Sequence, residues 1–270
     1  MPFYPSAMRI IAGEFRSRRL ATPPDDSITR PIPDRVKESL FGLLRGHCEG
    51  ATVFDGFAGT GALGLEALSR GAARCTFIEQ DKSIAALLSR NIDTLNVRSR
   101  ADLVIGDALG PGALARAPRP LTLAFLDPPY PLVQEPIGLK RVLAQMQKLV
   151  DLLTPDGFAI LRTPWPLLHK QGSPAPVAPT PIKRSKGRAE RRAGRDWQRD
   201  VMEPRSTPGR RAHDLSELAE QDEESDAIAQ QPPTVAKPNW VEVDLTLPNA
   251  QGPETHTYHN MAVHLYMRKP

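Results

Sequence analysis

Short β-rich runs alternate with helix-like stretches from residue 51 onward, and this alternation restricts the possible folds more than any other feature of the chain. The helix-like stretches carry apolar residues at helical spacing, and each joins one β-rich run to the next. Strands joined by helical crossovers lie parallel, so the pattern predicts a doubly wound α/β fold whose ligands bind beyond the carboxyl ends of the strands. The expected strands are 52–54, 75–78, 102–105, 121–126 and 158–161, and the expected helices are 62–70, 83–95 and 138–153.

The C-terminal segment follows a different pattern, in which apolar and polar residues alternate. This alternation occupies residues 240–247 and returns in residues 258–267. Between the two runs lie Pro248, Gly252 and Pro253, which are residues that turns favour. We therefore expect an antiparallel hairpin that closes the mostly parallel sheet.

Composition divides the 270 residues into three parts. Residues 1–48 precede the alternating pattern as a small N-terminal extension, and residues 49–166 together with 238–270 form the predicted catalytic core. Residues 167–237 begin with closely spaced prolines and continue as a basic block followed by an acidic block. Such a segment buries too little apolar surface to offset its chain entropy, so we expect a disordered insertion. Its basic half would either grip RNA non-specifically or be passive.

Charge and cysteine content exclude several classes of protein. Lys and Arg exceed Asp and Glu by 35 to 31, which suits a polyanionic partner without requiring one. The two cysteines, Cys48 and Cys75, lack metal-ligand spacing, so we expect neither a disulfide framework nor a metal site. Apolar runs are too short to span a membrane, and the N-terminus lacks a signal-peptide pattern, so a cytoplasmic protein is expected.

A glycine-rich loop follows the first expected strand. Asp55 ends that strand, and Gly59, Gly61 and Gly64 lead into the first crossover helix. Glycines let the backbone turn tightly and approach a ligand, and a helix N-terminus offers unpaired N–H groups. The loop therefore predicts a nucleotide-like cofactor. It also satisfies the G-x-G-x-x-G spacing of dinucleotide sites, so the loop by itself does not choose the cofactor.

Two further acidic residues follow the next expected strands. Glu79 ends the second strand, where a carboxylate can accept hydrogen bonds from the ribose hydroxyls of NAD or of S-adenosylmethionine. Asp107 follows the third strand, where it can accept an adenine amino proton or merely form a turn. The successive placement of Asp55, Glu79 and Asp107 at strand ends favours the cofactor roles over simple turn formation.

The fourth expected strand runs directly into Asp127, Pro128, Pro129 and Tyr130. The prolines remove two N–H donors and fix the backbone, Asp127 adds acceptor oxygens, and Tyr130 adds a flat ring. An exocyclic amine of a nucleobase would be held by Asp127 and the Pro128 carbonyl and stacked on Tyr130. An isolated match of this kind can be a rigid turn, but its position after the glycine loop favours an amino-methyltransferase. A dehydrogenase is disfavoured because the tetrad offers no proton relay.

Several motifs resemble those of the RsmD family, the 16S rRNA guanine-N2 methyltransferases. This resemblance implies a Rossmann-like class I methyltransferase fold, S-adenosylmethionine as cofactor, and 16S rRNA or a small-subunit assembly intermediate as partner. No metal is expected, because a sulfonium methyl group carries its own leaving group, and a monomer is the default expectation. The motifs are MRIIAGEFRSRRL (8–20), TRPIPDRVKESLF (29–41), DGFAGTGALGLEALSRGA (55–72), FIEQD (77–81), DPPY (127–130) and the closing MAVHLYMR (261–268).

The resemblance also implies a role for each matching residue. Contacts with the methionine part of the cofactor fall to Asp55, Phe57, Gly59 and Gly61, those with its ribose to Glu79, and those with its adenine to Asp107. The tetrad 127–130 would hold the guanine N2. Basic residues of the two N-terminal motifs would bind RNA phosphates, although a solvated basic face is the alternative for any one of them. They are Arg9, Arg16, Arg18, Arg19, Arg30, Arg35 and Lys37.

The chain also departs from the family pattern. Gly56 replaces a larger residue, Ile32-Pro33 replaces a small polar pair, and after the fifth strand an acidic residue gives way to Leu161-Arg162-Thr163-Pro164. Two other functions remain open at this point. One is an amino-methyltransferase for another nucleic acid, such as adenine in DNA or another rRNA site, and the other is a non-catalytic rRNA-binding assembly factor.

Overall fold

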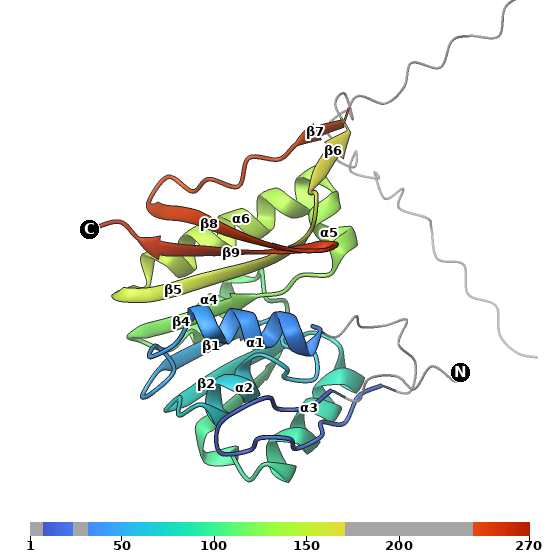
Figure 1. The fold of residues 1–270 in the computed structure, drawn as a ribbon, viewed down its shortest axis with the longest axis vertical. Coiled ribbons are helices and arrows are strands. Elements are labelled where there is room, and N and C mark those ends of the chain that lie inside the picture. The colour runs from blue at the N-terminus through green and yellow to red at the C-terminus, as the bar shows by residue number, and fades with distance from the viewer. Residues whose placement is uncertain (1–7, 24–31, 171–239) are drawn as a thin grey trace, which may run out of the picture. The chain divides into compact units, whose positions relative to one another are not determined.

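The computed structural model describes residues 8–23, 32–170 and 240–270, and the predicted α/β fold class is confirmed (Figure 1). Seven strands form one sheet in the order β3-β2-β1-β4-β5-β9-β8. The first five are parallel, whereas β9 is antiparallel to both β5 and β8. The strands of this sheet are β1 Thr52–Gly56, β2 Arg74–Glu79, β3 Ala101–Ile105, β4 Leu121–Leu126, β5 Leu153–Pro164, β8 Ala250–Tyr258 and β9 Met261–Arg268.

Helices cover both faces of the sheet, and a cluster of buried apolar side chains fills each interface. Alternate residues of β4 serve the two clusters: Leu123 and Phe125 join α1, α2 and α3, whereas Ala124 and Leu126 join α4, α5 and α6 (Figure 1). Because both faces of the central strands are buried, their sequences are almost continuously apolar. The helices are α1 Asp34–Leu43, α2 Gly64–Ser69, α3 Lys82–Thr94, α4 Pro111–Arg116, α5 Tyr130–Gln134 and α6 Pro136–Asp151, with a 3-10 turn at Arg98–Arg100.

The N-terminal arm, residues 8–23, folds back on itself and docks against α2. An antiparallel bridge joins Arg9 to Arg19 and closes its loop. Gly13 lies so close to α2 that a Cβ there would come within 1.8 Å of the Ser69 carbonyl oxygen, and its φ of +85° also favours glycine. The Glu14 N–H donates to the same oxygen at 2.7 Å. The arm is thus held by close backbone contact.

The C-terminal antiparallel hairpin is present, but its predicted first strand is wrong. Residues 250–258 pair with β9, whereas Trp240–Glu242 forms β7 and pairs with β6, Leu168–Lys170, in a separate two-stranded sheet. Leu245 and Leu247 are buried beside α6 without a strand ladder, so their alternation reflects packing. A bulge between Gln251 and Glu254 accommodates the expected turn residues, and such irregularities suit an exposed edge strand.

The first four residues of the predicted insertion, 167–170, are part of the described structure. Leu167 is buried, and β6 follows it, so the prediction of disorder is wrong for residues 167–170. The remainder of the predicted insertion lies outside the described residues. Within the described ranges, no helix combines the length and the apolarity that crossing a bilayer requires.

Candidate functional site

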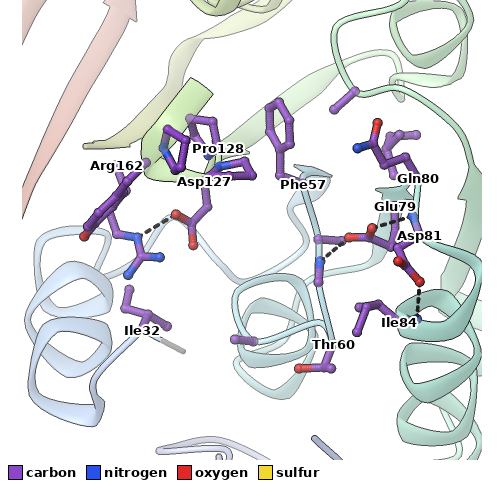
Figure 2. Close-up of a pocket in the computed structure, with 18 of the residues that line it drawn as sticks. Ile32, Phe57, Thr60, Glu79, Gln80, Asp81, Ile84, Asp127, Pro128 and Arg162 are labelled. Carbon is purple, nitrogen blue, oxygen red and sulfur yellow. Dashed lines mark hydrogen bonds and ion pairs between the residues drawn. The ribbon is translucent and has the colours of Figure 1, made fainter. Parts of the chain in front are cut away.

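A cavity of about 640 Å³ opens at the carboxyl ends of the parallel strands, where doubly wound folds bind ligands (Figure 2). Its volume falls in the range of small-molecule and cofactor sites. The glycine loop and the end of β2 line one part of the cavity, and the Asp127–Tyr130 tetrad lines another. The cavity therefore brings together two motifs that lie far apart in the sequence.

The glycine loop owes its shape to backbone conformations that few residues adopt. Phe57 has a φ of +62° without being glycine, which strains the backbone while its side chain faces the cavity (Figure 2). Gly59, with a φ of +55°, also lines the cavity, and a Cβ there would meet nothing within 4 Å. Gly61 serves packing instead, because a Cβ there would lie 2.5 Å from Leu88. Of the predicted loop residues, Phe57 and Gly59 reach the cavity, and Gly61 supports the turn.

Glu79 anchors the loop and faces the cavity. Its Oε2 accepts the Gly59 N–H at 2.9 Å, and its Oε1 accepts the Asp81 N–H at 2.8 Å (Figure 2). A carboxylate has more acceptor positions than these two bonds occupy. Glu79 therefore fixes the backbone at the end of β2 and retains acceptor capacity toward a ligand.

Asp55 is buried beneath the loop and is not part of the cavity lining. Its Oδ2 accepts the Gly64 N–H at 2.8 Å, which places the carboxyl group at the start of α2. Burial raises the pKa of Asp55 to about 7; the Gly64 hydrogen bond opposes this rise, and repulsion from Asp127 and Glu79 adds to it. Asp55 thus supports the loop and is poised to change its charge near neutral pH.

Asp107 lies beside the cavity without lining it. Its side chain is exposed, accepts the Leu109 N–H at 2.9 Å and pairs with Arg141 at 3.0 Å. The neighbouring Gly106 and Ala108 line the cavity instead. In this structure Asp107 forms a turn, which is the alternative that the sequence had left open.

The tetrad presents its acidic and aromatic groups at the other side of the cavity. Asp127, Pro128, Pro129 and Tyr130 all line it, with Tyr130 at the first position of α5. The Asp127 Oδ1 accepts a hydrogen bond from the Nε of Arg162 at 2.6 Å (Figure 2). The guanidinium carbon lies 5.8 Å from the centre of the Tyr130 ring, within cation–π range. The structure therefore adds an arginine to the predicted tetrad.

Most of the predicted RNA-binding residues are exposed. Arg9 forms an exposed ion pair with Asp34 at 2.9 Å, and Arg30 lies outside the described residues. Four further arginines are exposed and form no ion pair with any residue that the structure describes. They are Arg16, Arg18, Arg19 and Arg35.

Lys37 is a correction to the sequence analysis. Its side chain is completely buried, donates to the Arg9 carbonyl oxygen and lies 3.4 Å from Glu66. Burial lowers the pKa of Lys37, although the attraction of Glu66 opposes that shift. Lys37 therefore stabilises the N-terminal arm and cannot contact RNA from this position.

Sequence reasoning missed several cavity residues. Gln80 and Asp81 line the cavity and lie in the FIEQD motif, but that motif assigned a role only to Glu79. Gln134 also lines the cavity and lies in no motif. Arg162 did carry a signal, because it lies in the segment that departs from the family pattern after the fifth strand. No three acidic, cysteine or histidine side chains gather as a metal site would require in the part of the chain that the structure describes.

Comparisons with known proteins converge on one family. The family model described as conserved hypothetical protein 95 matches residues 8–171. The ribosomal RNA small subunit methyltransferase D of Haemophilus influenzae is 35% identical over 57% of this chain and 86% of its own length. The Escherichia coli protein of the same name is 42% identical over 49% of this chain and 66% of its own length. The solved structure of E. coli yhhF superposes with a TM-score of 0.56 at 23% identity, over 98% of this chain and 99% of its own, which shows the fold alone.

Proposed function

This chain belongs to the RsmD family of ribosomal RNA small-subunit methyltransferases, and we propose that it transfers a methyl group from S-adenosylmethionine to the exocyclic N2 of a guanine in 16S rRNA. The family that the sequence motifs predicted is confirmed. The observation that best supports the finer proposal is the single cavity shared by the glycine loop and the Asp127–Tyr130 tetrad. This cavity would hold the cofactor and the guanine amine side by side.

The residues at the loop side of the cavity fit S-adenosylmethionine. Glu79 offers carboxylate oxygens where ribose hydroxyls would donate, and Gly59 has open space where a side chain would otherwise stand. Ile84 and Ala108 supply apolar walls for a flat adenine. We propose that the predicted contacts of Asp55 and Asp107 are indirect, because neither side chain lines the cavity.

The tetrad would hold and orient the guanine. Asp127 would accept a hydrogen bond from N2 and provide an acceptor for the proton that N2 loses, and Tyr130 would stack on the base. When bound, S-adenosylmethionine supplies a methyl group on a sulfonium sulfur, which keeps the bonding electron pair as the N2 lone pair forms the new carbon–nitrogen bond. Orientation is the main contribution expected of the protein, since the amine lone pair is delocalised into the ring.

The exposed arginines of the arm and of α1 would bind the rRNA backbone. Arg16, Arg18, Arg19 and Arg35 carry the charge that phosphate contacts need, and such contacts fix register without reading sequence. Residues 1–48 would then engage RNA while the core performs the transfer. This part of the proposal predicts binding that weakens as salt concentration rises.

Methyl transfer to defined substrates tests the proposal. We would supply labelled S-adenosylmethionine with 30S particles or naked 16S rRNA from a bacterial strain lacking the corresponding gene, and then identify the labelled nucleoside. We expect the label in N2-methylguanosine. Label in another nucleoside, or in DNA offered in parallel, would refute the substrate and retain the chemistry. An absence of label would favour a non-catalytic assembly factor.

A pair of variants separates chemistry from folding. Asp127→Ala should abolish transfer because it removes the acceptor at the amine. Arg116→Met is the control, because Arg116 pairs with Asp102 at 2.7 Å on an exposed surface, and neither residue lines the cavity. Normal transfer by Asp127→Ala would refute the assigned role of the tetrad.

A further inference from the structure

Arg162 is the one cation that lines the cavity in the described part of the chain, and it comes from β5 rather than from any motif of the family. β5 lies between β4, which carries the tetrad at its end, and β9. Arg162 pairs with Val263 in the β5–β9 register, deep in the sheet. The guanidinium therefore reaches the tetrad from a rigid strand (Figure 2).

The contact between Arg162 and Asp127 is short and well shielded. Nε and Oδ1 are 2.6 Å apart, and the two side chains are only 8% and 17% exposed. The arginine Nη1 also lies 3.9 Å from the Met261 sulfur. Burial acts to lower the pKa of Arg162, but the attraction and hydrogen bond of Asp127, together with Tyr130, outweigh it and leave the pKa above its ordinary value. The arginine remains charged in the place where the tetrad needs a cation.

We propose that Arg162 is a positioning residue, which holds Asp127 Oδ1 so that Oδ2 is directed at the guanine N2. This inference rests on the proposed function. It also gives a role to the arginine that stands near the end of β5, where the family pattern has an acidic residue.

The physical need for such a cation comes from the other charges around the cavity. Asp127 repels the buried Asp55, and Glu79 adds a third carboxylate nearby. The Arg162 guanidinium offsets this repulsion, because it bonds the Asp127 carboxylate at hydrogen-bonding distance. Asp127 is thereby held in place at the cavity beside two other carboxylates.

Arg162 also links the two functional halves of the tetrad. Its guanidinium contacts the carboxylate of Asp127 and faces the ring of Tyr130. Arg162 therefore helps to place both the Asp127 carboxylate, which would accept from the amine, and the Tyr130 ring, on which the base would stack. Misplacing either by about 1 Å costs roughly 100-fold in rate, which sets the size of the expected effect.

The test compares Arg162→Met, Arg162→Lys and Asp127→Asn with the wild-type protein under the labelled methyl-transfer assay. Arg162→Met should lower kcat roughly 100-fold and leave the KM for S-adenosylmethionine nearly unchanged, because the arginine acts on the amine acceptor. Arg162→Lys should recover part of that loss, since it keeps the charge but not the planar donor geometry. Arg116→Met again serves as the matched arginine control.

The combined variant decides whether Arg162 acts through Asp127. In the Asp127→Asn background, Arg162→Met should cost little more, because the group that it positions has already been changed. An unchanged kcat for Arg162→Met, or an equally large further loss in the Asp127→Asn background, would refute this inference alone. Wild-type protein that methylates no rRNA would refute the proposed function and this inference with it. If Arg162→Met does not fold, the same comparison is made with Arg162→Lys.

Discussion

Glu66 and Asp127 are two of the carboxylates that pair with cations, and their surroundings differ in a way that separates a structural role from a chemical one. Glu66 on α2 is completely buried, accepts the Ile11 and Ala12 N–H groups, and pairs with Lys37 and Arg70. Asp127 at the end of β4 pairs with Arg162 and lines a cavity. The oxygens of Glu66 bond groups of the protein itself, whereas Asp127 faces a cavity that a substrate can occupy.

The difference shows why a cation in a motif is not by itself a binding residue. Lys37 and Arg35 lie two positions apart on α1, and the sequence analysis assigned both to RNA. Lys37 lies on the buried face of α1, beside Glu66, whereas Arg35 lies on its exposed face. We call Glu66 with Lys37 and Arg70 the sealed network, and Asp127 with Arg162 the open site. Changes in the sealed network should lower the free energy of unfolding, and changes in the open site should lower the rate of methyl transfer.

Removing the sealed carboxylate should produce the largest effect. Glu66→Ala leaves Lys37 buried without its counter-charge and releases two N–H donors of the N-terminal arm. Breaking a buried ion pair in this way costs about 3–5 kcal/mol of unfolding free energy. Urea denaturation measures it. The control is Arg98→Met, whose exposed pair with Asp93 should contribute less than about 1 kcal/mol. A loss as small as that of the control would mean that the network is not sealed.

Changing the open carboxylate should affect rate instead of stability. Asp127→Asn keeps the shape of the side chain but replaces one acceptor oxygen with a donor amide, which opposes the amine. We expect kcat to fall roughly 100-fold, or about 2.7 kcal/mol of activation free energy. The loss of unfolding free energy should be smaller than that of Glu66→Ala, because the amide oxygen can still accept from Arg162. Methyl transfer and urea denaturation are measured on the same preparation. A large loss of stability with little loss of rate would reverse the comparison.

The sequence predicted the centre of the sheet better than its edge. The parallel strands were predictable because their apolar runs serve both faces of a buried sheet, and the crossover helices α2, α3 and α6 followed from their apolar spacing. The short crossover helix α4 was not predicted. The β4 bounds, Leu121–Leu126, match the prediction at both ends. The first strand of the hairpin was mispredicted because an edge strand shows a largely exposed pattern, as Ala250–Tyr258 does. The alternating residues before it pack on α6 instead.

The site was predictable where a motif occupies consecutive positions. Residues 127–130 all line the cavity, as do Phe57, Gly59 and Glu79. Arg162 was visible only as a departure from a pattern, because its meaning depends on the strand order that brings β5 beside β4. The burial of Lys37 likewise depends on how α1 packs against α2 and the arm. Long-range pairings of this kind leave no local signal in the sequence.

Asn91 bonds both the N-terminal arm and the glycine loop. Its replacement should therefore affect both the free energy of unfolding and cofactor binding. Its side-chain N–H groups donate to the Ala21 and Thr60 carbonyl oxygens at 3.1 and 2.9 Å, and its Oδ1 accepts the Ala21 N–H at 2.7 Å. Asn91→Ala should cost about 1–3 kcal/mol, because buried backbone groups lose their partners. It should also weaken cofactor binding, since Thr60 lines the cavity. Calorimetry with S-adenosylmethionine and urea denaturation measure the two effects. Weaker stability with unchanged affinity would show that the regions are independent.

The smallest effect expected is the dependence of wild-type stability on pH, because Asp55 beneath the glycine loop and His264 on β9 act with opposite sign. The pKa of Asp55 is raised from 3.8 to about 7 by burial, so the folded protein holds a proton that the unfolded chain releases, and stability falls as pH rises through this window. His264 lies between Thr163 and Thr255, and burial lowers its pKa from 6.5 to about 4. The unfolded chain then takes up the proton first, so stability falls as pH decreases from 6.5 toward 4.

The two slopes oppose each other between pH 4 and 6.5, so each should emerge only when the other group is removed. Asp55→Asn should be more stable at pH 6.5 than at pH 4.5 relative to wild type, and His264→Gln should show the reverse, each by up to about 1.4 kcal/mol per pH unit. Urea denaturation at both pH values measures this difference. Parallel pH dependence in wild type and Asp55→Asn would mean that Asp55 is already ionised in the folded protein. Asp55 would then be a charged group like Asp127, and the charged part of the site would extend beneath the glycine loop.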